Sequence, residues 1–251
     1  MTNADDYREM TAVVTGAGSG IGQSIAATLA EAGMTVGGLD RDTASVPDTC
    51  SPLAADVRDS AAVAVAIDGF AEQHGKLDVL VGNAGVSCVD TIETASEDNW
   101  QRVFDINVFG QMRVIRAALP WLRKSRSASI VLVGSCSAIS GIPERATYSA
   151  SKGAVHALAR ALAVDLVDDG IRVNCASPGT VETPFVEALI ANADDPEATR
   201  KSMQQRQPTG RMVQPSEVAR AVLHLAHPGD RSTTGTTIVI DGGLGTLRPA
   251  T

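Results

Sequence analysis

Tyr148 and Lys152 are the two residues whose types and spacing point most directly to proton-transfer chemistry. They are separated by four positions, so on a predicted helix they lie on one face, one turn apart. A phenol has an ordinary pKa of about 10, and a neighbouring ammonium stabilises the phenolate and lowers that pKa toward the range of a general base. The same spacing is common in ordinary pairs on helix surfaces, so this pair alone does not establish a reaction.

Two further polar residues are expected near this pair. Ser135 follows the apolar run Ile130–Val133, at the carboxyl edge of a predicted parallel sheet, where its hydroxyl could hydrogen-bond a substrate carbonyl oxygen. Asn107 lies inside a predicted helix, where an amide has little structural advantage, and it could carry a water that links Lys152 to solvent. For Ser137 we expect only hydrogen bonds within its loop.

A glycine-rich segment follows the first predicted strand directly. Without Cβ atoms the backbone can turn sharply and approach a pyrophosphate, and the N-terminus of the following helix offers unpaired N–H groups. A glycine-rich string by itself also fits a flexible turn, but here it stands between a strand and a helix. This context predicts a dinucleotide site at Gly16, Ser19, Gly20, Ile21 and Gly22.

Asp40, at the end of the second predicted strand, indicates which dinucleotide the site binds, NAD or NADP. It lies about 20 residues after the glycines, where a carboxylate can accept hydrogen bonds from the adenosine ribose hydroxyls. The same carboxylate would repel a 2′-phosphate, so we expect NAD rather than NADP. Arg41 follows immediately and could pair with such a phosphate, which keeps NADP as the less favoured alternative.

Two more segments at strand ends are candidates for the cofactor site. Asp56 and Val57 could reach the adenine, although Asp56 could equally be a turn or helix-capping residue. Asn83, Ala84 and Gly85 follow the fourth predicted strand at the edge of the sheet where ligands bind in open α/β folds, and a plain turn is the competing interpretation.

Short apolar runs alternate with helical-period segments along the chain, which is typical of βαβ units. The expected strands are Met10–Thr15, Thr35–Leu39, Leu53–Asp56, Val79–Val81, Ile130–Val133, Arg172–Cys175 and Thr237–Ile240. The expected helices include Gly20–Ala32, Ser60–His74, Asn99–Arg126, Tyr148–Asp168 and Pro215–Ala226. We predict a single α/β domain over residues 1–251: a Rossmann-type doubly wound parallel sheet of about seven strands with helices on both faces. The segment Thr183–Val213 interrupts the alternation and is expected to be a lid or substrate-binding insertion.

Composition excludes several other classes of protein. A net charge of −8 argues against a nucleic-acid partner. No stretch reaches the roughly 20 apolar residues of a membrane span, and the polar N-terminus does not resemble a secretion signal. The four cysteines are widely spaced, so we expect reduced thiols, no zinc site and a cytoplasmic location. His224 and His227 lack a third nearby ligand, so we expect no metal.

Together these motifs resemble the short-chain dehydrogenase/reductase family over nearly the full length of the chain. The matching residues, in order, are Thr15-Gly-x-x-x-Gly-x-Gly22, Asn83-Ala-Gly85, Asn107, Ser135, Tyr148-x-x-x-Lys152 and Pro178-Gly179 with Thr183. The resemblance implies a catalytic tetrad in which Tyr148 is the acid/base residue and Ser135 orients the substrate. In the same tetrad Lys152 also holds the nicotinamide ribose and Asn107 supports a proton relay.

The resemblance also extends to cofactor contacts and to assembly. It implies that Pro178, Gly179 and Thr183 line the cofactor, with Thr183 at the nicotinamide carboxamide. It further implies a homotetramer formed through the helices predicted at Asn99–Arg126 and Tyr148–Asp168.

Two arginines could select the substrate. Arg145 and Arg206 could each clamp a carboxylate through the planar guanidinium fork, although most arginines are simply exposed. With the stretches Ser177–Pro184 and Asp241–Gly243, they resemble the branch that contains cytosolic-type 3-hydroxybutyrate dehydrogenases and 2-keto-3-deoxy sugar-acid dehydrogenases. In that branch the matching arginines bind the substrate carboxylate. A third arginine of that branch is replaced here by Leu189.

The sequence therefore predicts an NAD-dependent oxidoreductase that interconverts a secondary alcohol and a ketone, with a small hydroxy acid or sugar acid as the substrate. One alternative is a reductase of uncharged carbonyls such as a sugar, a steroid or a 3-oxoacyl thioester. The other is a catalytically silent binding protein on the same fold.

Overall fold

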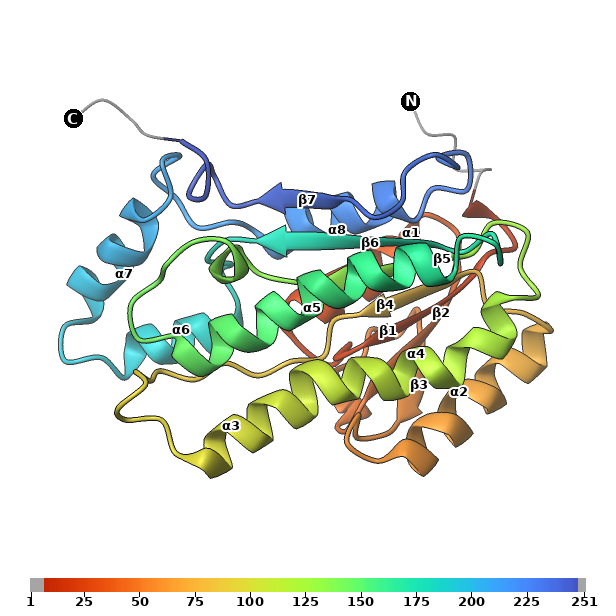
Figure 1. The fold of residues 1–251 in the computed structure, drawn as a ribbon, viewed down its shortest axis with the longest axis horizontal. Coiled ribbons are helices and arrows are strands. Elements are labelled where there is room, and N and C mark those ends of the chain that lie inside the picture. Colours follow the sequence, from red (N-terminus) through yellow and green to blue (C-terminus); the bar gives the residue numbers. More distant parts are fainter. Residues whose placement is uncertain (1–6, 248–251) are drawn as a thin grey trace.

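Seven short segments pair as parallel strands of one sheet in the computed structural model, which describes residues 7–247. The spatial order is β3-β2-β1-β4-β5-β6-β7, and it reverses direction between β1 and β4 (Figure 1). The bounds are β1 (Thr11–Thr15), β2 (Thr35–Asp40), β3 (Ser51–Ala54), β4 (Val79–Gly82), β5 (Ser129–Val133), β6 (Arg172–Pro178) and β7 (Thr237–Ile240). This order confirms the predicted doubly wound Rossmann-type sheet.

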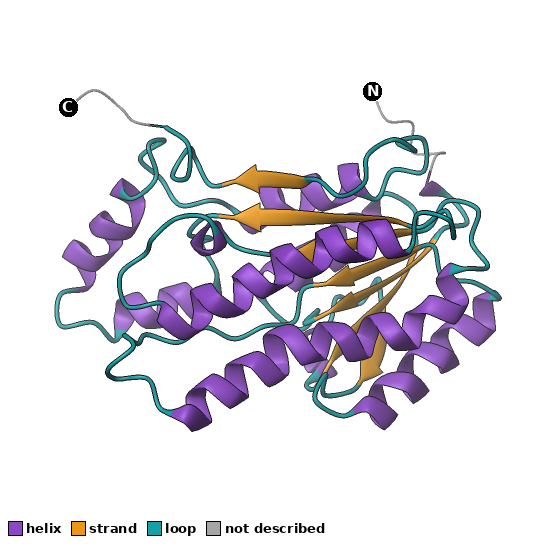
Figure 2. Cartoon of the chain, in the orientation of Figure 1, coloured by secondary structure: helices purple, strands orange, loops and turns teal. Residues whose placement is uncertain are grey.

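Both faces of the sheet are apolar and both are covered by helices. Successive strand residues point to opposite sides, so that Val13 packs in one core and Val14 in the other. One face carries α2 (Ser60–His74), α4 (Gly110–Leu122) and α5 (Ala146–Asp165); the other carries α1 (Gly20–Glu31) and α8 (Pro215–Leu225). Figure 2 shows the strands enclosed between these two helical layers.

The single long helix expected from Asn99 to Arg126 is wrong. The structure has α3 (Glu97–Phe104), a π-helical segment at Asp105–Phe109, and then α4, which ends at Leu122. In the π segment the Gly110 N–H donates to the Asp105 carbonyl, five positions back. Such single π turns are frequent at functional sites, and this one contains Asn107.

Two other predicted boundaries also differ. The third strand ends at Ala54 rather than at Asp56, because its pairing with β2 stops where Asp40 meets Ala54. Asp56 therefore lies beyond the strand. The helix expected from Tyr148 begins two residues earlier, at Ala146, and its regular part ends at Asp165.

The insertion at residues 183–213 folds into two short helices beyond the carboxyl edge of the sheet. They are α6 (Pro184–Ala191) and α7 (Pro196–Gln205), and Figure 1 shows them past the arrowheads of β6 and β7. Thr183 caps α6 by accepting from Val186 N at 3.3 Å, and Asp195 caps α7 by accepting from Ala198 N at 2.9 Å. Within the insertion, α6 packs against α7 and the segment after it through a small apolar cluster of Ile190, Met203 and Met212.

Within residues 7–247 no helix is long and apolar enough to cross a bilayer. The same residues contain no group of three or more histidine, cysteine or acidic side chains placed to hold a metal ion.

Candidate active site

A cavity of about 740 Å³ lies at the carboxyl edge of the sheet, between the strand ends and the insertion. It collects nearly all the residues singled out from the sequence: Gly16, Ser19, Gly20, Ile21, Gly22, Asp40, Asp56, Val57, Asn83, Ala84, Gly85, Ser135, Arg145, Tyr148, Lys152, Pro178, Gly179, Thr183 and Arg206. Asn107 is the exception, since it is fully buried beneath the cavity wall. The individual roles of these residues stay predictions, but the fold brings them to one place.

The glycine-rich turn is shaped so that side chains would obstruct it. Gly16 and Gly20 have φ angles of +69° and +53°, a conformation that favours glycine. A Cβ atom on Gly22 would overlap the carbonyl oxygen of Gly16. The turn packs tightly on itself, and its glycines line the cavity at the start of α1, where a pyrophosphate could approach the helix N-terminus. This cradle fits a dinucleotide.

Thr15 and Asn83 lock two cofactor loops together. The Thr15 hydroxyl accepts from the backbone N–H groups of Asn83 and Ala84, both at 3.0 Å, and donates to the Val81 carbonyl at 3.3 Å. The Asn83 side-chain amide donates to the Thr15 carbonyl at 2.9 Å. Thr15 is a positioning residue that sequence reasoning missed, and its place in the matched motif was the available signal.

Asp40 is the last residue of β2, and it lines the cavity. It accepts from the backbone N–H groups of Gly18 at 2.9 Å and of Asp42 at 3.1 Å, so it also holds the glycine turn in place. Asp56 lies nearby, and its two oxygens accept from Arg58 Nε at 3.1 Å and Nη2 at 2.6 Å. The hydrogen bond from Arg58 holds the pKa of Asp56 below its ordinary value. Asp56 also accepts from the backbone N–H of Arg58 at 2.9 Å, which is the turn-capping use expected as the alternative.

Tyr148, Lys152 and Ser135 line the cavity together. Lys152 is 4% exposed; its ammonium donates to the Val133 carbonyl at 2.9 Å and lies 5.8 Å from the centre of the Tyr148 ring. Ser135 lines the same cavity, and its hydroxyl acts to lower the pKa of Tyr148. This is the arrangement that the motif spacing predicted.

Burial affects the pKa of both Tyr148 and Lys152. Burial raises the pKa of Tyr148 to about 12, although the hydrogen bond from Ser135 acts to lower it. Burial also lowers the pKa of Lys152 to about 8. The reason is that removal of both groups from water disfavours their charged forms more than the neighbouring charges of the protein favour them.

Asn107 has a structural use that the sequence did not predict. Its Oδ1 accepts from Val86 N at 2.8 Å, and its Nδ2 donates to the Val86 carbonyl at 2.9 Å and to Ser151 Oγ at 3.0 Å. The side chain thus ties the loop after β4 to helix α5. Its proposed part in a proton relay stays a prediction.

Arg145 and Arg206 reach the same end of the cavity from different elements, the start of α5 and the end of α7. Arg145 is partly buried, and burial followed by the charge of Arg206 lowers its pKa. Neither arginine forms an ion pair with a carboxylate of residues 7–247. Two like charges therefore line one cavity without an ion pair in the described part of the chain, although the charge of Glu144 acts to raise the pKa of Arg145.

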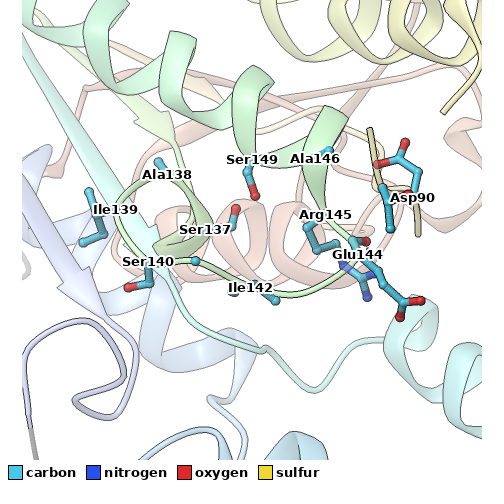
Figure 3. A pocket seen from close by; sticks show the side chains of 12 residues that line it. Asp90, Ser137, Ala138, Ile139, Ser140, Ile142, Glu144, Arg145, Ala146 and Ser149 are labelled. Atoms are coloured by element: carbon cyan, nitrogen blue, oxygen red, sulfur yellow. Dashed lines mark hydrogen bonds between the residues drawn. The ribbon is translucent and has the colours of Figure 1, made fainter. Parts of the chain in front are cut away.

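The inner wall of the insertion completes this end of the cavity with apolar side chains. They are Phe185, Val186, Leu189 and Met203. A second pocket of about 510 Å³ adjoins on the other side of the segment from Ser137 to Ala146 (Figure 3). Ser137, Ile142 and Arg145 line both spaces. Sequence reasoning missed the apolar wall, because the pattern of α6 and α7 does not reveal which side faces the sheet.

Comparison with known proteins agrees with this geometry. A protein-family model described as enoyl-(acyl carrier protein) reductase matches residues 16–245. The chain is 34% identical over 242 residues to the 3-oxoacyl-[acyl-carrier-protein] reductase FabG of Thermotoga maritima, covering 92% of this chain and 96% of that protein. It is 36% identical over 239 residues to a 2-keto-3-deoxy-L-fuconate dehydrogenase of Xanthomonas campestris, covering 92% and 78%.

Solved structures show the same likeness. The ligand-free aldohexose dehydrogenase of Thermoplasma acidophilum superimposes with a TM-score of 0.92 at 31% identity, covering 98% of each chain. The RhlG/NADP complex of Pseudomonas aeruginosa gives a TM-score of 0.89 at 33% identity, covering 98% and 100%. The chain therefore belongs to the short-chain dehydrogenase/reductase family. It is an oxidoreductase that acts on CH–OH groups and uses a nicotinamide cofactor.

Proposed function

We propose that this enzyme oxidises a small hydroxy acid or sugar acid to the corresponding keto acid, with NAD⁺ as the hydride acceptor. The observation that carries this proposal is the pair Arg145 and Arg206, two guanidinium groups that line the cavity and form no ion pair within residues 7–247. A substrate carboxylate would neutralise their mutual repulsion and could be bound through both planar forks.

The rest of the substrate end supports an acid of limited polarity. Leu189 and Met203 present apolar surface opposite the arginines. A carbon chain would bury against this wall, whereas each added hydroxyl would need a hydrogen-bond partner there. Of the two substrate classes, the structure therefore favours the hydroxy acid with a short apolar chain.

The catalytic cycle follows from the positions of the side chains. Tyr148 removes the proton of the substrate hydroxyl, and Ser135 donates a hydrogen bond to the same oxygen. Lys152 holds a positive charge near the phenol at pH values below its pKa of about 8. When bound, the oxidised nicotinamide supplies the hydride acceptor and a second positive charge. Both charges favour the phenolate and oppose the effect of burial.

We assign the cofactor as NAD because of Asp40. Its carboxylate stands beside the glycine turn at the adenosine end, where a 2′-phosphate would bring a second negative charge. Arg41 also lines the cavity and is exposed, so the choice between the cofactors has to be measured. The Pseudomonas relative, described as an NADP complex, makes that comparison necessary.

The first experiment is a spectrophotometric assay of reduced nicotinamide with NAD⁺ and with NADP⁺. The substrates are 3-hydroxybutyrate, sugar acids, free sugars and uncharged secondary alcohols. We expect turnover with NAD⁺ and with carboxylates. Activity confined to sugars or to 3-oxoacyl thioesters would discard the carboxylate assignment and favour the uncharged-carbonyl alternative, to which the FabG and aldohexose dehydrogenase relatives point.

Substitution of Arg206 tests the carboxylate site itself. Arg206→Ala should raise KM for the acid about tenfold or more, since a charge-assisted hydrogen bond contributes about 1.5–3 kcal/mol. It should leave the kinetics of an uncharged alcohol unchanged. Arg211→Ala is the matched control, because Arg211 belongs to the same insertion but forms an ion pair with Glu217 at 2.7 Å. An equal rise in KM for both kinds of substrate would rule out carboxylate binding by Arg206.

We further propose a homotetramer in the cytoplasm. The faces of α4 and α5 expose large apolar side chains at their ends, including Phe109 and Val164, which are 50% and 73% exposed. The four cysteines are all free thiols in the structure, as in a reducing compartment.

A further inference from the structure

Ser137 is joined directly to the hydroxyl of Ser135. Its backbone N–H donates to Ser135 Oγ at 3.2 Å, and its own hydroxyl donates to the same oxygen at 3.0 Å. Both serines are 6% exposed, so water does not readily replace these bonds. Ser137 thus does more than support its loop, which was its expected role.

A hydroxyl group has one hydrogen to donate and two lone pairs that accept. Ser137 supplies a donor to each lone pair of Ser135. The hydrogen of Ser135 is therefore left for a third partner, and Tyr148 lines the same cavity as Ser135. With its acceptor sites filled, Ser135 can act toward such a partner only as a donor.

We propose that Ser137 is a positioning residue that fixes the Ser135 hydroxyl as a hydrogen-bond donor toward Tyr148 and, once substrate is bound, toward the reacting oxygen. The proposal rests on the roles assigned above to Tyr148 and Ser135. Its chemical consequence is that negative charge on either oxygen is stabilised during proton transfer, without a reorientation of the serine.

The local backbone keeps Ser137 in this place. Residues Cys136–Ala138 form a short 3₁₀ turn directly after β5, in which Ala138 N donates to the Ser135 carbonyl at 3.0 Å. The next two backbone N–H groups, of Ile139 and Ser140, donate to the Cys136 carbonyl at 3.0 and 2.8 Å. The turn folds the Ser137 side chain back over the end of the strand.

Ser149 provides a matched control in the same pocket. Ser137 and Ser149 both line the pocket beside the active site, and Ser149 projects from the start of α5 (Figure 3). Ser149 lines that pocket but not the catalytic cavity, and no hydrogen bond of its side chain reaches Ser135. Ser149→Ala removes one hydroxyl oxygen from this pocket, as Ser137→Ala does.

The chain is well suited to a direct measurement of the phenol, because it has only two tyrosines, Tyr7 and Tyr148. A Tyr7→Phe background leaves Tyr148 as the sole tyrosine. The ultraviolet absorbance of tyrosinate in the NAD⁺ complex then reports the ionisation of Tyr148. The pH dependence of kcat for alcohol oxidation reports it independently through the acid limb of the profile.

In Ser137→Ala we expect both measurements to shift upward by about one pH unit, the size of a lost hydrogen bond to a charged oxygen. At pH values below the acid limb, kcat of Ser137→Ala should be about tenfold lower than that of the parent. At pH values above the limb, the two kcat values should converge. Ser137→Thr retains the hydroxyl and should restore both values, and Ser149→Ala should match the parent. Ser137→Cys, with a weaker donor, should shift less in the same direction.

One result would overturn the proposal: in Ser137→Ala, kcat falls equally at every pH, while the acid limb of the pH profile and the tyrosinate titration do not shift. Ser137 would then have a merely structural role. Thermal unfolding of each variant identifies any variant that fails to fold, in which case Ser137→Cys carries the test. Tyr148→Phe separates this outcome from a failure of the proposed function. If that variant keeps turnover, the assignment of the acid/base residue is wrong, whatever Ser137 does.

Discussion

Lys152 carries a positive charge in a site from which water is nearly excluded. Its ammonium has one hydrogen bond within the described chain, to the Val133 carbonyl, and burial lowers its pKa from 10.5 to about 8. A difference of this size corresponds to an energetic cost of up to about 3 kcal/mol for the charged form in the folded protein. The residue that supports the phenolate therefore destabilises the fold at neutral pH.

Lys152→Met should accordingly abolish turnover and raise the free energy of unfolding by up to about 3 kcal/mol at neutral pH. The folded protein binds the proton less tightly than the unfolded chain. The cost is therefore fully present below about pH 8 and disappears as the pH rises through 10.5. Urea unfolding at pH 7 and pH 10 measures both effects. Lys201→Met, at an exposed lysine, is the control. A Lys152→Met protein that is less stable than the parent at pH 7 would contradict this account.

The turn between β1 and α1 determines how closely a cofactor can approach the backbone. Gly22 faces the Gly16 carbonyl, and there is no space between them for a methyl group. A substitution there must displace backbone atoms rather than the end of a flexible side chain. The position of the whole helix N-terminus depends on this contact.

Gly22→Ala should therefore lose cofactor affinity and destabilise the fold by about 2 kcal/mol or more. Gly69→Ala is the informative partner. Gly69 is exposed within α2 and has no neighbour within 4 Å of an added Cβ, so helix propensity should stabilise that variant by about 0.5–1 kcal/mol. Calorimetric titration with NAD⁺ and chemical unfolding compare the two. Normal cofactor binding in Gly22→Ala would show that the turn adapts.

At the scale of elements, periodicity predicted the seven strands and the major helices but not the interruption at Asp105–Phe109. Hydrophobic spacing changes little when one turn widens from α to π. What stabilises the wider turn is tertiary: Asn107 bonds both polar groups of the Val86 backbone, which lies 21 positions earlier in the chain. The same applies to the end of β3, which depends on the partner strand.

The quaternary structure is a property of the whole molecule that its surface allows us to test. Val164 on α5 is 73% exposed, and Val167 just beyond the helix is 56% exposed. Exposed apolar residues grouped on one helix end favour an interface. Sedimentation equilibrium should give about four times the chain mass of 26.0 kDa.

Val164→Glu should reduce the assembly to smaller species by burying a charge at the interface. Val65→Glu, at a valine of similar exposure (75%) on α2, should leave the mass unchanged. A monomeric parent protein, or equal dissociation of both variants, would contradict an interface on α5.

The sequence by itself determined the fold class and the family, and it predicted the residues of the chemical site. Strand and helix periods, glycines and short motifs are local properties, and their spacing places Tyr148 one turn from Lys152 whatever surrounds them. It also predicted the location of the cofactor site, because the carboxyl ends of parallel strands share one edge of the sheet.

Only the tertiary structure decided the electrostatics and the second layer of contacts. Burial, which depends on every neighbouring element, raises the pKa of Tyr148 and lowers that of Lys152. The bonds from Ser137 to Ser135 depend on how one turn folds back over a strand end. The approach of Arg145 to Arg206 depends on how the insertion packs over the sheet. These properties arise from distances between segments far apart in the chain, which residue spacing does not encode.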